Sequence, residues 1–105
     1  MSIQKNPSVI QKVIEASEKG CLIPSFHAEK QMNARDVQMS DIEEMLYRAS
    51  REEIKDQIRD DGKDWKYALR GTNDNGDKDI RIIVVFNEPE TLIITVIDKD
   101  KKEDR

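Results

Sequence analysis

The stretch DIRIIVVFNEPETLIITVI, residues 79–97, decides the fold of this chain. It contains two runs rich in β-branched residues, separated by Asn-Glu-Pro-Glu, which is typical of a tight turn. Because both runs are nearly continuous in apolar residues, they predict two central strands, 79–86 and 91–97, with both faces covered. Thr95 interrupts the second run, either as a satisfied core hydroxyl or as one end of a site.

A third strand is expected immediately before this hairpin. In WKYALRG, residues 65–71, the bulky side chains of Trp65, Tyr67 and Leu69 alternate with smaller or charged ones, as in a strand with one packed face. The link TNDNGDK, residues 72–78, contains an Asn-Gly pair that tolerates positive φ. The two segments therefore predict a second hairpin.

The preceding segment, residues 52–59, is ambiguous. Ile54 and Ile58 are four residues apart, which suits a helix face or alternate positions of a strand. We interpret it as an edge strand, followed by a turn at DDGKD, residues 60–64.

Three helices are expected towards the N-terminus, at about residues 7–19, 26–34 and 41–49, because apolar residues recur there at helical spacing. The residues expected to begin or end them are Asn6, Pro7 and Gly20 for the first, Ser25 for the second, and the capping pair Ser40 and Glu43 for the third.

Together these elements predict an α+β fold, with the N-terminal helices packed on one face of a three- to four-stranded antiparallel sheet. Residues 1–98 are expected to form one domain, since no Pro-, Gly- or Ser-rich stretch divides them. Residues 99–105 carry only charged side chains and are expected to be a solvated, flexible tail.

Charge limits the functions that fit this sequence. The 105 residues are 38% charged and 36% hydrophobic, with a formal net charge of −4. A net negative charge counts against broad, charge-driven nucleic-acid binding. Residues 1–40 and 65–86 each carry one more basic than acidic side chain, so a modest local basic patch remains compatible with the sequence.

Cys21 is the single cysteine and His27 the single histidine, which excludes an internal disulfide and a Cys/His metal cluster. The sequence predicts no metal or other cofactor. It contains neither the apolar run of a signal peptide nor 18 consecutive apolar residues. We therefore expect a soluble, cytoplasmic protein that does not enter a membrane.

The second predicted helix carries the most interesting cluster. At about 100° per residue, His27, Gln31 and Arg35 fall on one side of it, at the border between core and solvent. A neutral imidazole there could accept a proton near neutral pH. The alternative is that His27 only packs or caps locally, while the stem of Arg35 only covers apolar surface.

The predicted strands supply further basic groups. Arg70 and Arg81 flank the long hairpin and would lie close together if the register allows, and Lys66 precedes them in the same strand. Two guanidinium groups near an imidazole would suit a phosphate. The alternative is that both arginines are simply solvated.

The order of these pieces resembles a known family. SFHAEKQMNARDVQMSDIEEML (25–46), WKYALRGTNDNGDKDIRIIVVF (65–86) and LIITVI (92–97) are similar to members of domain of unknown function 4258. Those members share a Ser-x-His-Ala start, a later Met and Arg in the same helix, and a Thr in an apolar final strand. Asp36 stands where the family pattern has Gly.

The resemblance implies a RelE- or barnase-like fold and a relationship to the toxins of bacterial toxin–antitoxin systems. Similar domains are thought to cleave RNA without metal, by attack of a ribose 2′-hydroxyl on the adjacent phosphate. The family pattern carries over to His27, Arg35 and Thr95. Together with Arg81 these form the expected catalytic set, and Arg70, Gln31 and Lys66 the expected RNA-binding set. The partner would be RNA.

A second function remains open, that of a non-catalytic interaction module of the same fold. The apolar strands leave one face of the sheet to bind a partner, such as an antitoxin segment or a second copy of this chain in a homodimer.

Overall fold

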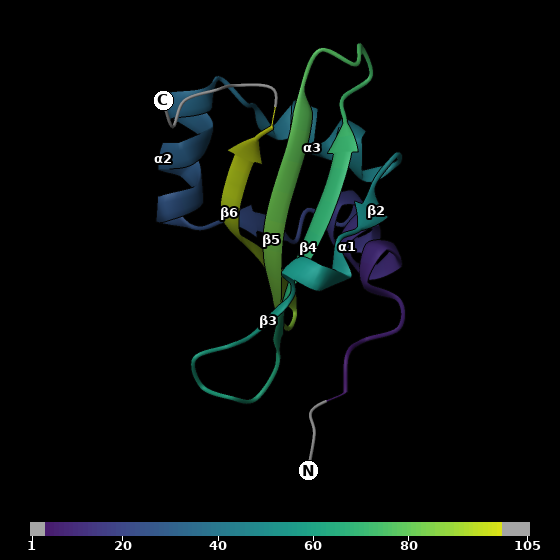
Figure 1. Cartoon of the computed structure of the whole chain (residues 1–105), viewed down its shortest axis with the longest axis vertical. Helices are drawn as coiled ribbons and strands as arrows, with labels where there is room; N and C mark the ends of the chain where they lie inside the picture. The colour runs from purple at the N-terminus through teal and green to yellow at the C-terminus, as the bar shows by residue number, and fades with distance from the viewer. Residues whose placement is uncertain (1–3, 100–105) are drawn as a thin grey trace.

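A computed structural model describes residues 4–99 and confirms the α+β class (Figure 1). The helices are α1 (Val9–Glu18), α2 (Phe26–Arg35) and α3 (Met39–Leu46), and a short 3₁₀ turn, η1, spans Glu53–Lys55. The strands are β1 (Leu22–Pro24), β2 (Ser50–Arg51), β3 (Gln57–Ile58), β4 (Trp65–Thr72), β5 (Asp79–Asn87) and β6 (Glu90–Asp98).

The sheet is larger than the three to four antiparallel strands that the sequence predicts. It has six strands in the order β1-β6-β5-β4-β2, with β3 also paired to β4. The three central strands form antiparallel pairs as expected, but β1 lies parallel to β6. The sheet is therefore mixed. The added strands have two or three residues each, too few to show a period in the sequence.

The prediction of one edge strand over residues 52–59 is confirmed only at Gln57–Ile58, where β3 pairs with β4. The chain turns through η1 and pairs with β4 only at β2 and β3, and Ile54 is 92% exposed. The cause is Asp56, whose fully buried carboxylate accepts hydrogen bonds from Arg51 and from the backbone N–H of Ala68. This side-chain bond occupies a donor of β4 and bends the chain between the two short strands.

One face of the sheet carries the core. In Figure 1, α1 and α3 lie behind the sheet, and α3 contacts β4. The inward side chains of the central strands are almost completely buried, as the alternation in β4 predicts for Tyr67 and Leu69. The largest fully buried residues are Val13, Ile42, Met45, Leu46, Tyr67, Leu69, Ile80, Ile82, Val84, Ile93 and Val96.

The other face of the sheet, here called the open face, is only partly covered, which corrects the expectation that both faces are buried. Its side chains include Arg81, Ile83, Thr95 and Ile97, all of intermediate exposure. Helix α2 lies beside β6 rather than over the middle of the sheet (Figure 1). The apolar runs of β5 and β6 therefore place some side chains in the core and others on the open face, which remains accessible to solvent.

The helix ends agree with the sequence at α2 and differ at α3. The Ser25 hydroxyl accepts a hydrogen bond from the Ala28 N–H at 3.1 Å, so the predicted cap is confirmed. Helix α3 begins at Met39, and its capping pair is Gln38 with Asp41 rather than Ser40 with Glu43. A side-chain amide thus takes the capping role two residues before the predicted position.

Helix α1 begins at Val9, two residues after the predicted start, and Asn6 accepts a hydrogen bond from the Ser8 N–H. Gly20 follows this helix at φ 75°, as predicted. The turns at residues 60–64 and 72–78 are also confirmed, with Gly62 and Gly76 at positive φ.

The predicted tail at 99–105 lies outside the described residues, apart from Lys99. The backbone N–H of Lys99 donates a hydrogen bond to the carbonyl oxygen of Asp79. Within residues 4–99, every helix is too short or too polar to cross a membrane.

Candidate functional site

Strand register brings the two strand arginines together, as predicted. Arg70 of β4 lies directly opposite Arg81 of β5, so both side chains emerge on the open face. The same alternation places Ile83 opposite Ala68, and Thr95 of β6 opposite Ile83. Arg70, Arg81 and Thr95 thus share one face of the sheet.

Both guanidinium groups are bound by carboxylates. Arg81 donates two hydrogen bonds to Glu52, one of them 3.0 Å long, and Arg70 donates two to Asp79 at 2.9 and 2.6 Å. Glu52 also lies 3.8 Å from Arg70 and so bridges the two arginines. The cluster has two positive and two negative groups, which corrects the expectation of an exposed pair of cations.

These contacts shift the acid–base properties of the cluster. The hydrogen bond from Arg81 is the main cause that lowers the pKa of Glu52, against the opposing effect of burial. Arg70 lowers the pKa of Asp79 in the same way, and Glu52 raises the pKa of Arg81. Glu52, Asp79 and Arg81 are therefore charged near neutral pH.

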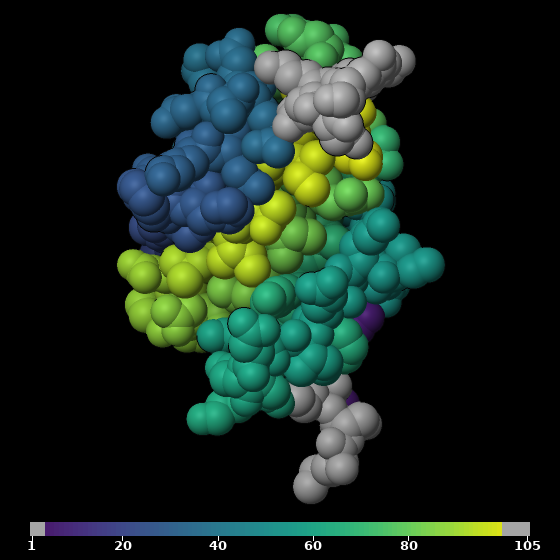
Figure 2. All heavy atoms as spheres, turned by 60° about the vertical axis from the view of Figure 1, so that its left-hand side comes forward, coloured from purple at the N-terminus to yellow at the C-terminus, as the bar shows by residue number. Residues whose placement is uncertain are grey.

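A hollow lies next to this cluster on the open face. Figure 2 shows this part of the surface, where β6 and β5 run between α2 and the teal segment around residues 50–64. The hollow is lined by Lys55, Gln57, Lys66, Arg81, Ile83, Ile94, Thr95 and Ile97.

An irregularity in β6 shapes this hollow. Ile83 pairs with Thr95 and Val84 with Ile93, so Ile94 is an additional residue in β6. Such a bulge breaks the strict alternation of side chains along a strand. It explains why two neighbours, Ile94 and Thr95, both line the hollow.

The α2 residues lie beside the hollow and do not line it. Gln31 lies between His27 and Arg35 on one side of α2. Its Oε1 accepts a hydrogen bond from the Val96 N–H at 2.8 Å. His27 and Arg35 are one turn away in either direction, so the same side of α2 turns towards β6. His27 is exposed and Arg35 is half-buried.

The structure therefore divides the seven predicted site residues into two groups. Lys66, Arg81 and Thr95 line one hollow, and Arg70 lies beside Arg81. His27, Gln31 and Arg35 form a second group along α2. Gln31 also has a structural role that the sequence did not predict, because its amide binds the backbone of β6.

Sequence reasoning missed Glu52 and Asp79. Asp79 could have been found, because it lies two residues before Arg81 and therefore on the same face of a strand. Glu52 gave no such signal, since it reaches Arg81 from 29 positions away through a turn. Lys55 and Gln57 also line the hollow and were not identified for the same reason.

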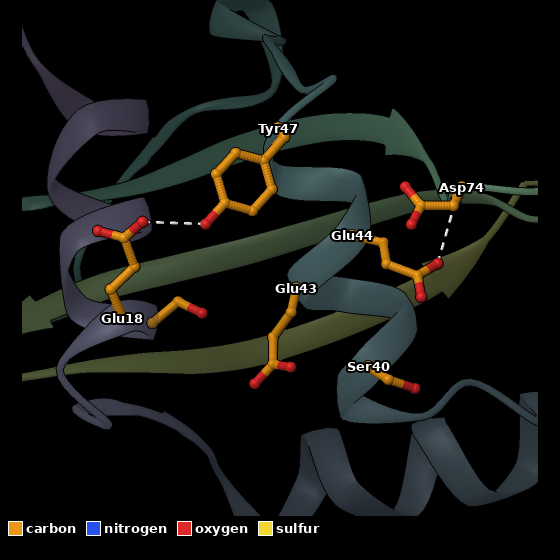
Figure 3. Close-up of a pocket in the computed structure, with 7 residues that line it drawn as sticks. Glu18, Ser40, Glu43, Glu44, Tyr47 and Asp74 are labelled. Carbon is orange, nitrogen blue, oxygen red and sulfur yellow. Dashed lines mark hydrogen bonds between the residues drawn. The ribbon is translucent and has the colours of Figure 1, made fainter.

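A different pocket lies between α1 and α3 and has the opposite charge (Figure 3). Its lining includes Glu18, Glu43, Glu44 and Asp74. The Tyr47 hydroxyl donates to Glu18 at 3.0 Å, which raises the pKa of that tyrosine. Four carboxylates make this pocket unsuitable for a phosphate, so the open face is the better candidate.

No three His, Cys, Asp or Glu side chains among residues 4–99 are arranged to hold a metal ion. The described site consists instead of ammonium, guanidinium, carboxylate, hydroxyl and imidazole groups, which bind anions and transfer protons.

Fold and site together define a small α+β domain with an ionic cluster and a hollow on its open sheet face. The family described as Domain of unknown function (DUF4258) matches residues 25–98. The chain belongs to this family. No curated protein and no solved structure matches the chain.

Proposed function

We propose that this protein is a metal-independent endoribonuclease with a RelE- or barnase-like fold, related to the toxins of toxin–antitoxin systems. The hollow on the open face would hold the scissile phosphate. The supporting observation is that Lys66, Arg81 and Thr95 line one hollow, beside a carboxylate that can move a proton.

That carboxylate, Glu52, supplies the second proton-transfer group that a single histidine leaves missing. Cleavage requires a base for the ribose 2′-hydroxyl, stabilisation of the charged phosphorane and an acid for the leaving oxygen. Glu52 would accept the 2′-hydroxyl proton as the new O–P bond forms. The imidazole of His27 would supply the proton to the 5′-oxygen as the old P–O bond breaks, leaving a cyclic phosphate.

The Glu52–Arg81 ion pair would link phosphate binding to the basicity of Glu52. An incoming phosphate would take the guanidinium of Arg81 and displace Glu52 from it. Because the Arg81 hydrogen bond is the main cause of the lowered pKa of Glu52, its loss would raise that pKa. Substrate binding would therefore make the carboxylate a stronger base where it is needed.

The test is cleavage of a labelled RNA by purified protein in a chelating buffer, with a 2′-deoxy oligonucleotide as the substrate control. We expect His27→Ala and Arg81→Ala to reduce the cleavage rate by about 10²- to 10⁴-fold. Arg48→Ala is the matched control, because Arg48 pairs with Asp74 at a surface away from the hollow. Equal stability of the RNA with wild type and variants would overturn the proposal.

Glu52→Gln separates binding from chemistry. Removing the carboxylate should strengthen RNA binding, because Arg81 is then available to phosphate, while cleavage falls for lack of the base. The measurement is RNA affinity by fluorescence anisotropy beside single-turnover cleavage. A variant that binds less RNA and cleaves as fast as wild type would contradict the assigned role.

The second candidate function is a non-catalytic interaction module. It is favoured by the carboxylates that already bind both strand arginines, since a preformed phosphate site would leave guanidinium groups available. Growth arrest on expression, relieved by the product of a neighbouring gene, would distinguish a toxin from such a module.

A further inference from the structure

Part of the lining of the hollow is apolar, has no role in phosphate binding, and is here called the floor. Ile83, Ile94 and Ile97 form this floor, and all three are only half-buried. Apolar surface left in water is unfavourable relative to buried apolar surface. The bulge in β6 adds Ile94 to this surface, where regular alternation would have turned it to the opposite face.

The rim of the hollow is basic, although the protein as a whole is acidic. Lys55, Lys66 and Arg81 line it, and none of the eight lining residues is acidic. Arg81 is bound to Glu52, but Lys55 is exposed and Lys66 lies 3.9 Å from the fully exposed carboxylate of Asp60. Two ammonium groups therefore remain available to an incoming ligand.

We propose that the hollow binds an acidic amphipathic segment of a partner protein. Its apolar side chains would cover the three isoleucines, and its Asp or Glu side chains would pair with Lys55 and Lys66. This proposal rests on the second function above, the interaction module, and names the chemistry of its partner. Charge complementarity selects an acidic segment, and the aliphatic floor selects one with apolar side chains.

The aliphatic floor of the hollow suits protein side chains better than RNA bases. Proteins bind single-stranded RNA largely by stacking its bases on aromatic or guanidinium planes. The eight described lining residues include no aromatic side chain, and the guanidinium of Arg81 is held by Glu52. Aliphatic side chains instead complement Leu, Ile or Val of another protein.

The segment would lie on the face of the sheet and not extend it. The far edge of β4 is already paired with β2 and β3. Recognition therefore depends on side chains, and charge reversal at the rim is the sharpest way to test it.

The probe is a library of random-sequence peptides displayed on phage and selected on the purified full chain. We expect enrichment of peptides that combine Leu, Ile or Val with Asp or Glu. On the double variant K55E/K66E, these peptides should lose affinity by about tenfold or more, because like charges then face each other. Selection on that variant should instead enrich basic peptides.

Glu43→Lys is the matched control, since it reverses a charge in the acidic pocket between α1 and α3. It should leave binding of the acidic peptides unchanged. Circular dichroism confirms folding, and the switch to basic peptides gives a readout that an unfolded variant could not produce. A milder variant, Lys55→Gln, should weaken binding in the same direction.

Other outcomes would overturn the proposal in distinguishable ways. Peptides that bind the hollow without acidic residues would refute the acidic partner but keep the interaction module. Absence of any peptide sensitive to K55E/K66E, with a labelled RNA oligonucleotide bound there instead, would refute both. A wild-type dimer in light scattering that becomes a monomer on Ile97→Asp would assign the hollow to a second copy.

Discussion

At the scale of single residues, Asp36 shows how a departure from the family pattern is accommodated. It follows α2 in the left-handed region, at φ 56° and ψ 43°, a conformation that glycine adopts at no steric cost. Asp tolerates this region better than most residues. The turn therefore keeps the geometry that the family's Gly would have, with some strain.

We predict that Asp36→Gly stabilises the fold by about 0.5–1 kcal/mol, because relief of this strain exceeds the added freedom of the unfolded chain. Asp36→Ala should have the opposite sign, since alanine keeps the strain and lacks the short polar side chain that makes the left-handed region tolerable for Asp. Urea unfolding measures both. A loss of stability with glycine would show that the Asp36 side chain contributes more than its backbone costs.

Gly71 in β4 has a different reason to be glycine. A Cβ atom added to it would lie 2.7 Å from the carbonyl oxygen of Met45 and 3.0 Å from Cα of Ala49. These are backbone atoms, so they cannot rotate away. Helix α3 approaches the sheet closely because this strand position carries no side chain.

Gly71→Ala should destabilise the protein by about 1–3 kcal/mol through overpacking. The melting temperature measures this, and Asn87→Ala, an exposed strand position, should stay within about 0.5 kcal/mol of wild type. An unchanged melting temperature for Gly71→Ala would mean that α3 can shift without cost.

At the scale of elements, Asp56 holds three parts of the chain together. Its buried carboxylate bonds to Arg51 of β2 and to the Ala68 N–H of β4, and it lies 3.0 Å from Lys5 near the N-terminus. Burial alone would raise the pKa of Asp56, but these partners outweigh it and lower the pKa. The carboxylate replaces the strand pairing that residues 53–56, between β2 and β3, lack.

Asp56→Asn should cost about 2 kcal/mol at neutral pH, because the hydrogen bonds from Arg51 and from the Ala68 N–H lose their charged acceptor. Asp60→Asn is the control, since that carboxylate is fully exposed and should contribute little. Chemical denaturation of both variants tests this. Similar values for the two would contradict the role given to Asp56.

Strands and helices were predictable from the sequence where their patterns are long. The alternation in β4 and the apolar runs of β5 and β6 indicated that Arg70 and Arg81 would meet if the register allowed, and the observed register brings them together. The bulge at Ile94 was not predictable, because its neighbours are also apolar and an inserted residue leaves no mark in such a run. Ile94, one of the three isoleucines that form the floor of the hollow, thus depends on a feature without a sequence signal.

At the scale of the whole molecule, acid should weaken the fold. The pKa values of Glu52, Asp56 and Asp79 are all lower in the folded protein than the ordinary values of 4.5, 3.8 and 3.8. A lowered folded pKa gives stabilisation that is complete above the unfolded pKa and is lost as the pH falls through the folded one. The loss should therefore begin near pH 4 to 5.

We predict that the free energy of unfolding in urea falls steadily below about pH 4.5, and that E52Q/D79N reduces the slope. The double variant removes two of the three lowered carboxyl groups. The matched control is Glu43→Gln, an exposed glutamate outside this cluster. An unchanged slope for E52Q/D79N would mean that other carboxylates control acid unfolding.

The layout of the whole sheet was only partly predictable. Its three long strands follow from local pattern, but β1, β2 and β3 arise from contacts between distant segments, such as Leu22 with Thr91. Likewise, His27 and Arg35 lie within the family match over residues 25–98 and were candidate site residues from the sequence. Glu52 was recognised only from its contact with Arg81 in the folded protein. Local sequence determines elements, and tertiary contacts determine which charges meet.

The bond between Gln31 and Val96 has a consequence for the protein at high concentration. Beyond the three residues paired with β1, the outer edge of β6 would present backbone N–H groups that could recruit a strand from another molecule. Gln31 occupies one of them, and Pro24 ends β1 without an N–H to offer. Gln31, together with helix α2 beside β6, thus protects the edge of an aliphatic strand from pairing with another molecule, and Gln31→Ala would remove the side-chain part of that protection.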